Sequence, residues 1–520
     1  MNTVKKNWKI RIMQSIEKSI PNPQTDRFNR KEYLSLLIMY SLAWGATLLL
    51  NRSLFWDDWI FEQYNLQQLR TIYSVRGTPY EFWYWSIGWY SSPVFFRFVT
   101  FTCYFIGSLL FGQVLFQFSW NFLTRRNIFL ITALTMVLPL NLARASVCTS
   151  HYALTYFCFF LGWYLLIVKR NRFYFTLSVI FFVYSFTTSS LLFFYLWPVS
   201  HYLFIKCIKS RNADRPLGRK FVLLILPIAV FIIKRLIFEP YGAMSDYNSI
   251  RLHYLMAGLF LLALPLTTLL WITTSRFNVR NAKLKMWMPL ISGIAILLSG
   301  MLPYFAVGYF PPYVSWNTRH EYLQSIGFAI AIIGFSGVLS HNLKWLSKTL
   351  IPKLVLMVAV ITTLAFSISF YFDSQKQASI VQTISQDPVI SSASTVFFVD
   401  STTKSNVFDR PYDSMEWSGM LHAAFSDSSR IGLNYDVSEV KKIFLTSFVN
   451  SEMSVFLPQQ YTPKKQVVIV YVSYRETRSN LLDNVPYLRY FVVDQPLVQI
   501  TTISYTDISV ILSDLRLGND

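Results

Sequence analysis

Cysteine is scarce in this 520-residue chain, and several common catalytic motifs are absent from it. Its four cysteines, Cys103, Cys148, Cys158 and Cys207, lie in or beside apolar segments. They form neither a disulfide framework nor a metal-ligand spacing, so we interpret them as small apolar packing residues. The chain has no Walker loop, GxGxxG, GxSxG or CxxC motif, so soluble nucleotide or hydride chemistry has no support.

Acidic residues are rare in the first 372 residues, which hold 11 Asp and Glu against 35 Lys and Arg. The excess positive charge lies in short loops between apolar runs. This is the positive-inside pattern, so the net charge of +20 reports membrane topology and does not predict a nucleic-acid partner. Residues 373–520 are different, with 12 basic and 16 acidic side chains.

Long apolar runs recur between Leu34 and Phe372, and each is long enough to cross a bilayer. The first run has no cleavage site, so we expect a retained span and no signal peptide. An odd number of spans with a cytoplasmic N-terminus places residues 373–520 outside the membrane. The 11 predicted spans are 33–51, 93–118, 127–143, 152–168, 173–187, 190–205, 221–238, 253–274, 286–302, 322–340 and 350–372.

The predicted fold is a polytopic α-helical membrane protein with a small C-terminal extracytoplasmic α/β domain. Residues 1–32 form a basic, amphipathic cytoplasmic segment. Residues 33–372 form the transmembrane domain, with a long outer loop at 52–92. In residues 373–520 the pattern predicts strands and helices of a domain of standard size. The strands are Val396–Val399, Val467–Tyr474 and Tyr490–Val493, and the helices are Ser414–Phe425 and Val437–Thr446.

Two adjacent carboxylates, Asp57 and Asp58, follow the first span and lie between Trp56 and Trp59. Carboxylates close to lipid are costly and usually functional, although a solvated turn in an aromatic belt stays an alternative. A positioned carboxylate can take the proton of a hydroxyl acceptor, and a second one can raise its pKa or orient the acceptor. We slightly prefer Asp58 as the base. The residues expected to bind the acceptor are Trp56, Trp59, Glu62 and Glu81.

Basic side chains on the outer side are the second group of candidates, because an anionic phosphate would explain why they persist there. Headgroup contact is the alternative for any one of them. Arg319 and His320 are favoured because they follow a proline-rich loop. Lys234 and Arg235 lie within an apolar run, where unpaired charge is expensive. Arg144 is a further candidate. His151, His253 and His320 are dispersed, so no metal site is predicted.

An acidic pair after the first span, about 11 spans, short cytoplasmic loops and a C-terminal outer domain resemble the GT-C superfamily. These integral-membrane glycosyltransferases use polyprenyl-phosphate-linked sugars. The family's acidic motif matches Asp57-Asp58, and the resemblance implies that one of them is the base, or orients the acceptor, in an inverting displacement. The loop from Trp316 to Glu321 resembles a loop that contributes to the lipid-phosphate pocket. The WWDYG-type motif of oligosaccharyltransferases is absent, which disfavours transfer to asparagine.

The expected function is therefore sugar transfer at the outer face of the inner (cytoplasmic) membrane. The expected partners are membrane lipid, a polyprenyl-phosphate sugar donor and a glycan, lipid or protein acceptor, and a requirement for a divalent cation is left open. A flippase for lipid-linked glycan is an alternative, but it needs polar residues along a path through the bilayer. An O-antigen-type polymerase would have a large outer loop between late spans. A non-catalytic scaffold would tolerate the loss of both aspartates.

Overall fold

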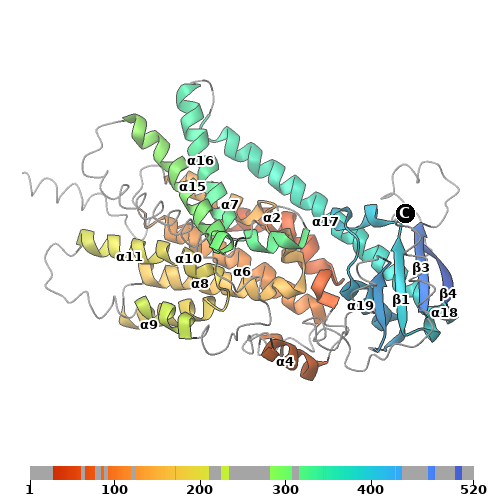
Figure 1. Cartoon of the computed structure of the whole chain (residues 1–520). Coiled ribbons are helices and arrows are strands. Elements are labelled where there is room, and N and C mark those ends of the chain that lie inside the picture. Colours follow the sequence, from red (N-terminus) through yellow and green to blue (C-terminus); the bar gives the residue numbers. More distant parts are fainter. Residues whose placement is uncertain are drawn as a thin grey trace, which may run out of the picture.

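The computed structural model describes residues 27–59, 65–75, 84–86, 92–118, 123–169, 171–209, 224–233, 282–306, 308, 315–343, 345, 347–427, 429–435, 467–474 and 498–505. Within these ranges the chain is a bundle of helices joined by one long helix to a small sheet (Figure 1). Residues 1–26 of the predicted basic segment 1–32 lie outside the described residues.

The helices of the bundle are mostly long and apolar. They are α2 (Arg30–Gly45), α4 (Leu66–Val75), α6 (Ser92–Leu115), α7 (Arg125–Val137), α8 (Ser150–Val168), α9 (Arg172–Ser185), α10 (Ser190–Phe194), α11 (Leu196–Lys209), Leu224–Ile233, α15 (Ala282–Ala306), α16 (Gln324–Asn342) and α17 (Leu350–Ser385). A π-helical turn, η1 (Ala46–Leu50), extends α2. Short 3-10 helices join several of them: η2 (Trp56–Trp59), η4 (Leu142–Ala145), η5 (Val147–Thr149) and η6 (Ser315–Glu321).

Six segments of the described chain are long and apolar enough to cross a membrane. They are Arg30–Leu50, Pro93–Leu115, Val147–Val168, Met286–Phe305, Gln324–Asn342 and Leu350–Ser385. They coincide with the predicted spans 33–51, 93–118, 152–168, 286–302, 322–340 and 350–372. The span 253–274 and much of 221–238 lie outside the described residues, so the total of 11 stays a prediction.

Two predicted spans are wrong as continuous helices. In place of 127–143, α7 ends at Val137, because Pro139 disfavours helical backbone at Leu138, whose ψ is 131°. The segment 190–205 divides into α10 and α11. Pro198 has no N–H to donate to the carbonyl of Phe194, which weakens a continuous helix at that turn.

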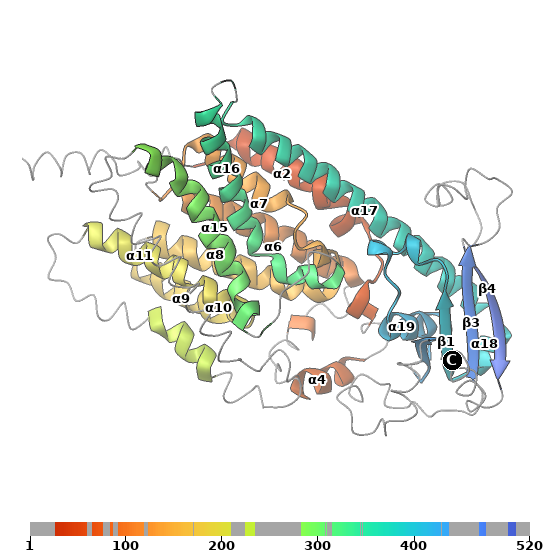
Figure 2. The same ribbon diagram turned by 45° about the horizontal axis from the view of Figure 1, so that its top comes forward.

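Helices α2 and α17 lie side by side and run in the same direction (Figure 2). Their register is fixed by hydrogen bonds from Thr47 Oγ1 to Ser367 Oγ (2.5 Å) and from Ser367 Oγ to the carbonyl of Ala43 (3.3 Å). The outward side of α17 is apolar and exposed as far as Tyr371, whereas Asp373 and Lys376 are buried polar residues. The exposed apolar surface of α17 therefore ends close to residue 372, where the sequence analysis places the end of the last span.

Helices α15 and α16 approach one another more closely than most helix pairs. A Cβ atom at Gly293 would lie 2.3 Å from the backbone nitrogen of Ala331, and one at Gly327 would lie 2.3 Å from that of Leu297. Only glycine fits at these two positions. Small residues serve this purpose in membrane bundles, where close backbone contact replaces the hydrophobic driving force between helices.

The sheet follows α17 and has the strand order β2-β1-β3-β4. Its strands are β1 (Thr395–Asp400), β2 (Ile431–Asn434), β3 (Val467–Tyr474) and β4 (Val498–Tyr505). Strand β1 is parallel to β2 and β3, and β4 is antiparallel to β3. The helices beside it are α18 (Pro388–Ser392) and α19 (Ser414–Phe425), and α19 connects β1 to β2.

The sequence predicted some of these elements and missed others. Strands β1 and β3 and helix α19 are confirmed. Strands β2 and β4 were missed, and the predicted strand Tyr490–Val493 and helix Val437–Thr446 lie outside the described residues. The position of this region outside the membrane stays a prediction.

Candidate functional site

The aspartate pair lies where the bundle meets the sheet region. Both residues belong to η2, which packs against the first turns of α19: a Cβ atom at Gly419 would lie 2.6 Å from the Cβ of Trp59. The amide of Trp56 donates a hydrogen bond to Glu416 Oε1 at 3.0 Å. Residues 360 positions apart in sequence therefore meet at this junction.

Backbone strain is concentrated around the same junction. Trp56, Asn141, Phe408 and Asp409 all have φ between 41° and 65°, a region that bulky L-residues rarely adopt. Trp56 belongs to a small apolar cluster with Ala145, and Phe408 packs against it. Strained backbone of this kind gathers at functional sites, where the surrounding structure holds it in place.

Asp58 is fully buried and its carboxylate is surrounded by donors. Its Oδ1 accepts hydrogen bonds from Ser146 Oγ (2.5 Å) and the Cys148 amide (2.8 Å). Its Oδ2 accepts hydrogen bonds from the amides of Val147 (2.8 Å) and Phe55 (3.2 Å). Four donors occupy the lone pairs of this buried carboxylate, so no oxygen of Asp58 is accessible to a substrate hydroxyl. The preference for Asp58 as the base is therefore corrected.

Arg97 is the cation that accompanies Asp58. Its Nη2 lies 3.9 Å from Asp58 Oδ2, and both side chains are fully buried. The guanidinium also donates to the carbonyls of Ala145 (2.9 Å), Asn51 (2.7 Å) and Ser53. Arg97 and Asp58 together join the end of the first span to the segment before α8. This is a structural ion pair, and the sequence analysis did not identify Arg97.

Asp57 has different surroundings from Asp58, although the two are adjacent. Its side chain is half-buried, and its charge acts on Asp413, just before α19. Burial, together with the charges of Glu416 and Asp57, raises the pKa of Asp413 to about 7. Asp57 and Asp413 are therefore close enough to influence one another. The charge of Asp57 therefore reaches a residue of the C-terminal region.

Three residues of the C-terminal region complete the site, and sequence reasoning missed all of them. Glu416 accepts hydrogen bonds from the Trp56 amide, from the Asp413 amide (3.1 Å) and from Arg410 Nη2 (2.6 Å). Arg410 also lies 5.1 Å from the centre of the Trp56 ring. Although burial opposes it, Glu416 raises the pKa of Arg410 above its usual value. The spacing Asp413-x-x-Glu416 is a capping box that predicts a helix start, but it does not predict the contact with Trp56.

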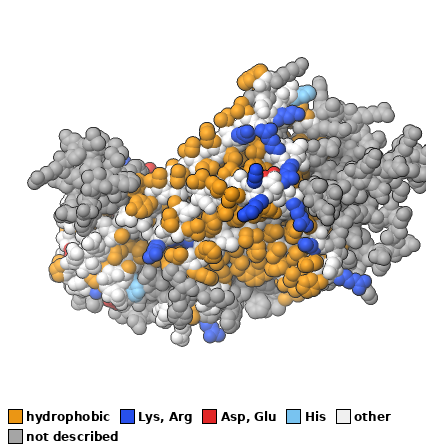
Figure 3. All heavy atoms as spheres, turned by 180° about the vertical axis from the view of Figure 1, so that it is seen from behind, with side chains coloured by type: hydrophobic (Ala, Val, Ile, Leu, Met, Phe, Trp, Pro, Cys, Tyr) orange, Lys and Arg blue, Asp and Glu red, His pale blue; other side chains and the backbone are white. Residues whose placement is uncertain are grey.

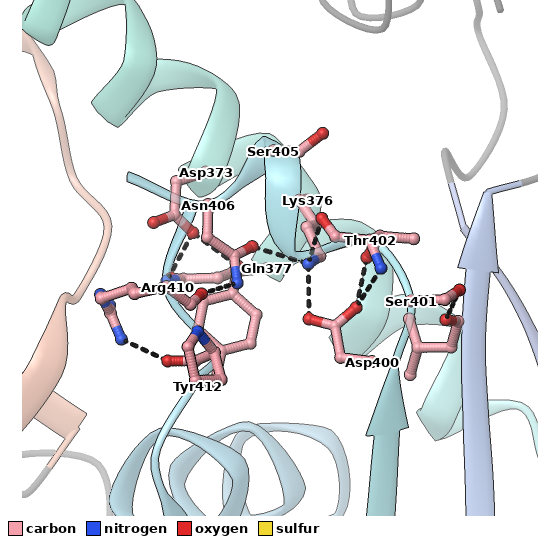
Figure 4. Close-up of polar contacts among 12 residues, drawn as sticks. Asp373, Lys376, Gln377, Asp400, Ser401, Thr402, Ser405, Asn406, Arg410 and Tyr412 are labelled. Atoms are coloured by element: carbon pink, nitrogen blue, oxygen red, sulfur yellow. Dashed lines mark hydrogen bonds and ion pairs between the residues drawn. The ribbon is translucent and has the colours of Figure 1, made fainter. Parts of the chain in front are cut away.

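A buried polar network holds the segment between β1 and α19 against α17 (Figure 4). Lys376 Nζ donates to Asp400 Oδ2 (2.7 Å), to Asn406 Oδ1 (2.6 Å) and to the carbonyl of Thr402 (3.1 Å). Asp373 accepts hydrogen bonds from the Tyr412 hydroxyl (2.5 Å) and the Val407 amide (3.0 Å). Because each buried charge has several partners, the network fixes the position of the segment that carries Arg410.

Helix η6 brings Arg319 to the same junction. The guanidinium of Arg319 lies 4.5 Å from the centre of the Trp316 ring, and that ring lies 5.4 Å from the ring of Trp56. Arg319 is half-buried and remains a candidate for phosphate binding. His320 is no longer a candidate for binding phosphate as a cation. Burial and, to a smaller extent, the charge of Arg319 lower its pKa to about 3, so its ring is neutral near pH 7.

Arg144, a predicted phosphate-binding residue of the outer side, is enclosed by the bundle. Its side chain is buried, with its guanidinium 4.1 Å from the centre of the Trp44 ring and 4.7 Å from that of Tyr104. It donates to the carbonyl of Asn141 at 3.1 Å. The helix that carries it, η4, packs against η6 through a hydrogen bond from the Ala143 amide to Thr318 Oγ1 (2.9 Å).

The two tryptophans of η2 are buried, not displayed to an acceptor. Trp59 is 6% exposed and packs into the apolar core of the sheet. Trp56 is 3% exposed and contacts Trp316 and Phe370. Stacking of a sugar on Trp59 is therefore excluded. Trp56 packs between η6 and α17 through its contacts with Trp316 and Phe370. The other predicted site residues, Glu62, Glu81, Lys234 and Arg235, lie outside the described residues.

Glu321 is a buried acid that the sequence analysis placed only in a loop. Its side chain is 1% exposed, its Oε1 has no hydrogen-bond partner within the described residues, and burial raises its pKa to about 8. The folded protein therefore holds a proton at pH 7 that the unfolded chain releases. Stability contributed by this proton is present at low pH and falls as pH rises from roughly 4.5 to 8.

Glu321→Gln, which mimics the protonated form, is expected to flatten that fall. The measurement is the thermal unfolding midpoint of the detergent-solubilised protein across this pH range, with wild type beside it. A variant with the same pH dependence as wild type would show that Glu321 is not the group responsible.

The fold defines a polytopic membrane protein whose last span leads directly into a mixed sheet. Comparisons of the chain with protein-family models, with curated proteins and with solved structures found no match. In the part of the chain that the structure describes, no group of three or more His, Cys, Asp or Glu side chains is arranged to hold a metal ion.

Proposed function

We propose that this protein transfers a sugar from a polyprenyl-phosphate-linked donor to a hydroxyl acceptor at the outer face of the cytoplasmic membrane, with inversion. Asp57 is the general base and Asp58 is its positioning residue. Arg319 binds the phosphate of the donor, and Arg410, paired with Glu416, holds the start of α19 against Trp56. The C-terminal region is part of the site in this proposal because it provides Arg410 and Asp413.

The observation that carries the proposal is the contrast between the two aspartates. Asp58 is held by four hydrogen bonds and Arg97, which fixes the turn, whereas Asp57 on the same turn stays partly accessible. The turn follows the first span directly and lies at the level where the apolar surface of α17 ends. A rigidly held carboxylate at this level suits a reaction between a lipid-borne donor and a soluble acceptor.

The reaction needs few groups. The acceptor oxygen attacks the anomeric carbon, the bond from that carbon to the phosphate oxygen breaks, and the polyprenyl phosphate leaves with the electron pair. Asp57 takes the acceptor proton as the new bond forms. Arg319 is half-buried, so its charge is less screened by water when it stabilises the leaving phosphate. The sequence leaves a requirement for a divalent cation open, so the assay below is run with and without magnesium.

The test is donor cleavage by the purified full-length chain in liposomes. The liposomes contain a panel of polyprenyl-phosphate hexoses radiolabelled in the sugar, and an envelope extract provides acceptors. We expect one donor to lose its label to the acceptor fraction while free polyprenyl phosphate appears. Movement of intact labelled lipid between leaflets would instead identify a flippase. If the chain neither cleaves nor moves any donor, the scaffold alternative replaces the proposal.

A further inference from the structure

The end of the bundle opposite to the sheet carries a group of exposed basic side chains. They come from the starts of α2 and α7 and from the segment that begins α17. We call this group the basic corner; it consists of Arg30, Lys31, Arg126, Lys348 and Lys353, all exposed. Figure 3 shows Lys and Arg side chains gathered at one end of a broad hydrophobic surface.

The register of the helices places these side chains at one level. Helices α2 and α17 run parallel, and Thr47 is level with Ser367. Counting back along both helices at equal rise puts Arg30 level with residue 350, between Lys348 and Lys353. Helix α7 is parallel to α2 as well. Trp44 Nε1 donates to the carbonyl of Met136 near the C-terminal ends of the two helices, and Arg125 donates to Glu32 near their N-terminal ends.

No carboxylate neutralises the basic corner within the described residues. Glu32 is the acidic side chain at this end of the bundle, and Arg125 already occupies it, with Arg125 Nη2 2.7 Å from Glu32 Oε2. The other described acids before residue 372 are Asp57, Asp58 and Glu321, at the opposite end. Five basic side chains therefore share one corner without a counter-charge from the described part of the protein.

The surface next to the corner is apolar and exposed. Leu34 (57%) and Ile38 (50%) follow the α2 cations, and Leu354 (47%) and Met357 (54%) follow the α17 cations. Trp345, in the connection before α17, is 79% exposed. Trp residues of this kind anchor a protein at the membrane–water boundary. The corner therefore combines positive charge for a headgroup with apolar surface for the chains below it.

We infer that the basic corner binds the headgroup of an anionic glycerophospholipid, with its acyl chains along the exposed sides of α2 and α17. Positive side chains close to an anionic membrane surface each add attraction that salt screens. The inference needs no catalytic activity, so it stands or falls independently of the proposed glycosyl transfer.

The test is a binding titration with the detergent-purified full-length chain. The probes are phosphatidylglycerol and phosphatidylcholine, each fluorescent on an acyl chain. Wild type is expected to bind phosphatidylglycerol more tightly, and raising the salt concentration should reduce that preference. The double variants Arg30→Gln/Lys31→Gln and Lys348→Gln/Lys353→Gln are each expected to weaken phosphatidylglycerol binding by about fivefold for each cation removed.

Arg52→Gln/Arg70→Gln is the matched control, because it removes two exposed cations from the opposite end of the first span and its loop. It should bind both lipids as wild type does. Unchanged phosphatidylcholine binding by each variant checks that the variants are folded. Equal binding of the two lipids by wild type, or a phosphatidylglycerol preference that survives in both double variants, would overturn the inference. A loss shared by the control would overturn it too, because the effect would then not belong to the corner.

Discussion

Asp58→Asn is expected to destabilise the junction between the bundle and the sheet by about 3–5 kcal/mol, because it removes one partner of a buried, hydrogen-bonded ion pair. The asparagine side chain keeps the shape of the aspartate but replaces one acceptor oxygen by an NH2 group. Each oxygen of Asp58 accepts at least one backbone N–H bond, so either orientation of the amide sets a donor against a donor. The charge of Arg97, fully buried beside it, also loses its counter-charge.

Two measurements report this loss at different scales. The thermal unfolding midpoint of the detergent-solubilised protein should fall. Locally, the Cys148 thiol should react faster with a maleimide, because the Cys148 amide is one of the groups that Asp58 holds. Asp57→Asn makes the same chemical change at a half-buried position and should shift stability by no more than about 0.5 kcal/mol. Equal stability of the two variants would show that Asp58 does not organise the turn.

The membrane part of the fold could be predicted where the apolar pattern is long and uninterrupted. Six predicted spans match helices because length and hydropathy alone decide them. The prediction failed at 127–143 and 190–205, where Pro139 and Pro198 divide apolar runs that composition treats as continuous. Strand β2 was missed because only four residues form it, and its place is set by pairing with β1.

The candidate site was predictable in position but not in composition. The rarity of acids in an apolar chain directed attention to Asp57 and Asp58, and the structure places both at the junction with the sheet. Nothing in the local sequence distinguishes the buried aspartate from the accessible one, because the partners of Asp58 are Arg97 and the segment 146–148. Likewise, Glu416 meets Trp56 across 360 residues, a distance over which spacing carries no information.

The predicted phosphate-binding cations show a related failure. Arg144 was predicted to bind phosphate on the outer side, but the rings of Trp44 and Tyr104 and nearby carbonyls enclose it. A cation that is surrounded by aromatic faces and carbonyl oxygens is stable in an interior position. Sequence position places a charged residue along the membrane normal, but it does not tell whether the side chain points into the bundle or away from it.

The rate of donor cleavage by Asp57→Asn tests the central claim most directly. Loss of a general base is expected to reduce the rate by about a hundredfold to ten-thousandfold, with the unfolding midpoint unchanged. Asp409→Asn is the matched control, because it removes an exposed carboxylate from the nearby loop at a φ of 52°, which asparagine tolerates. It should cleave the donor as wild type does. Cleavage by Asp57→Asn at the wild-type rate would contradict the assignment of Asp57 as the base.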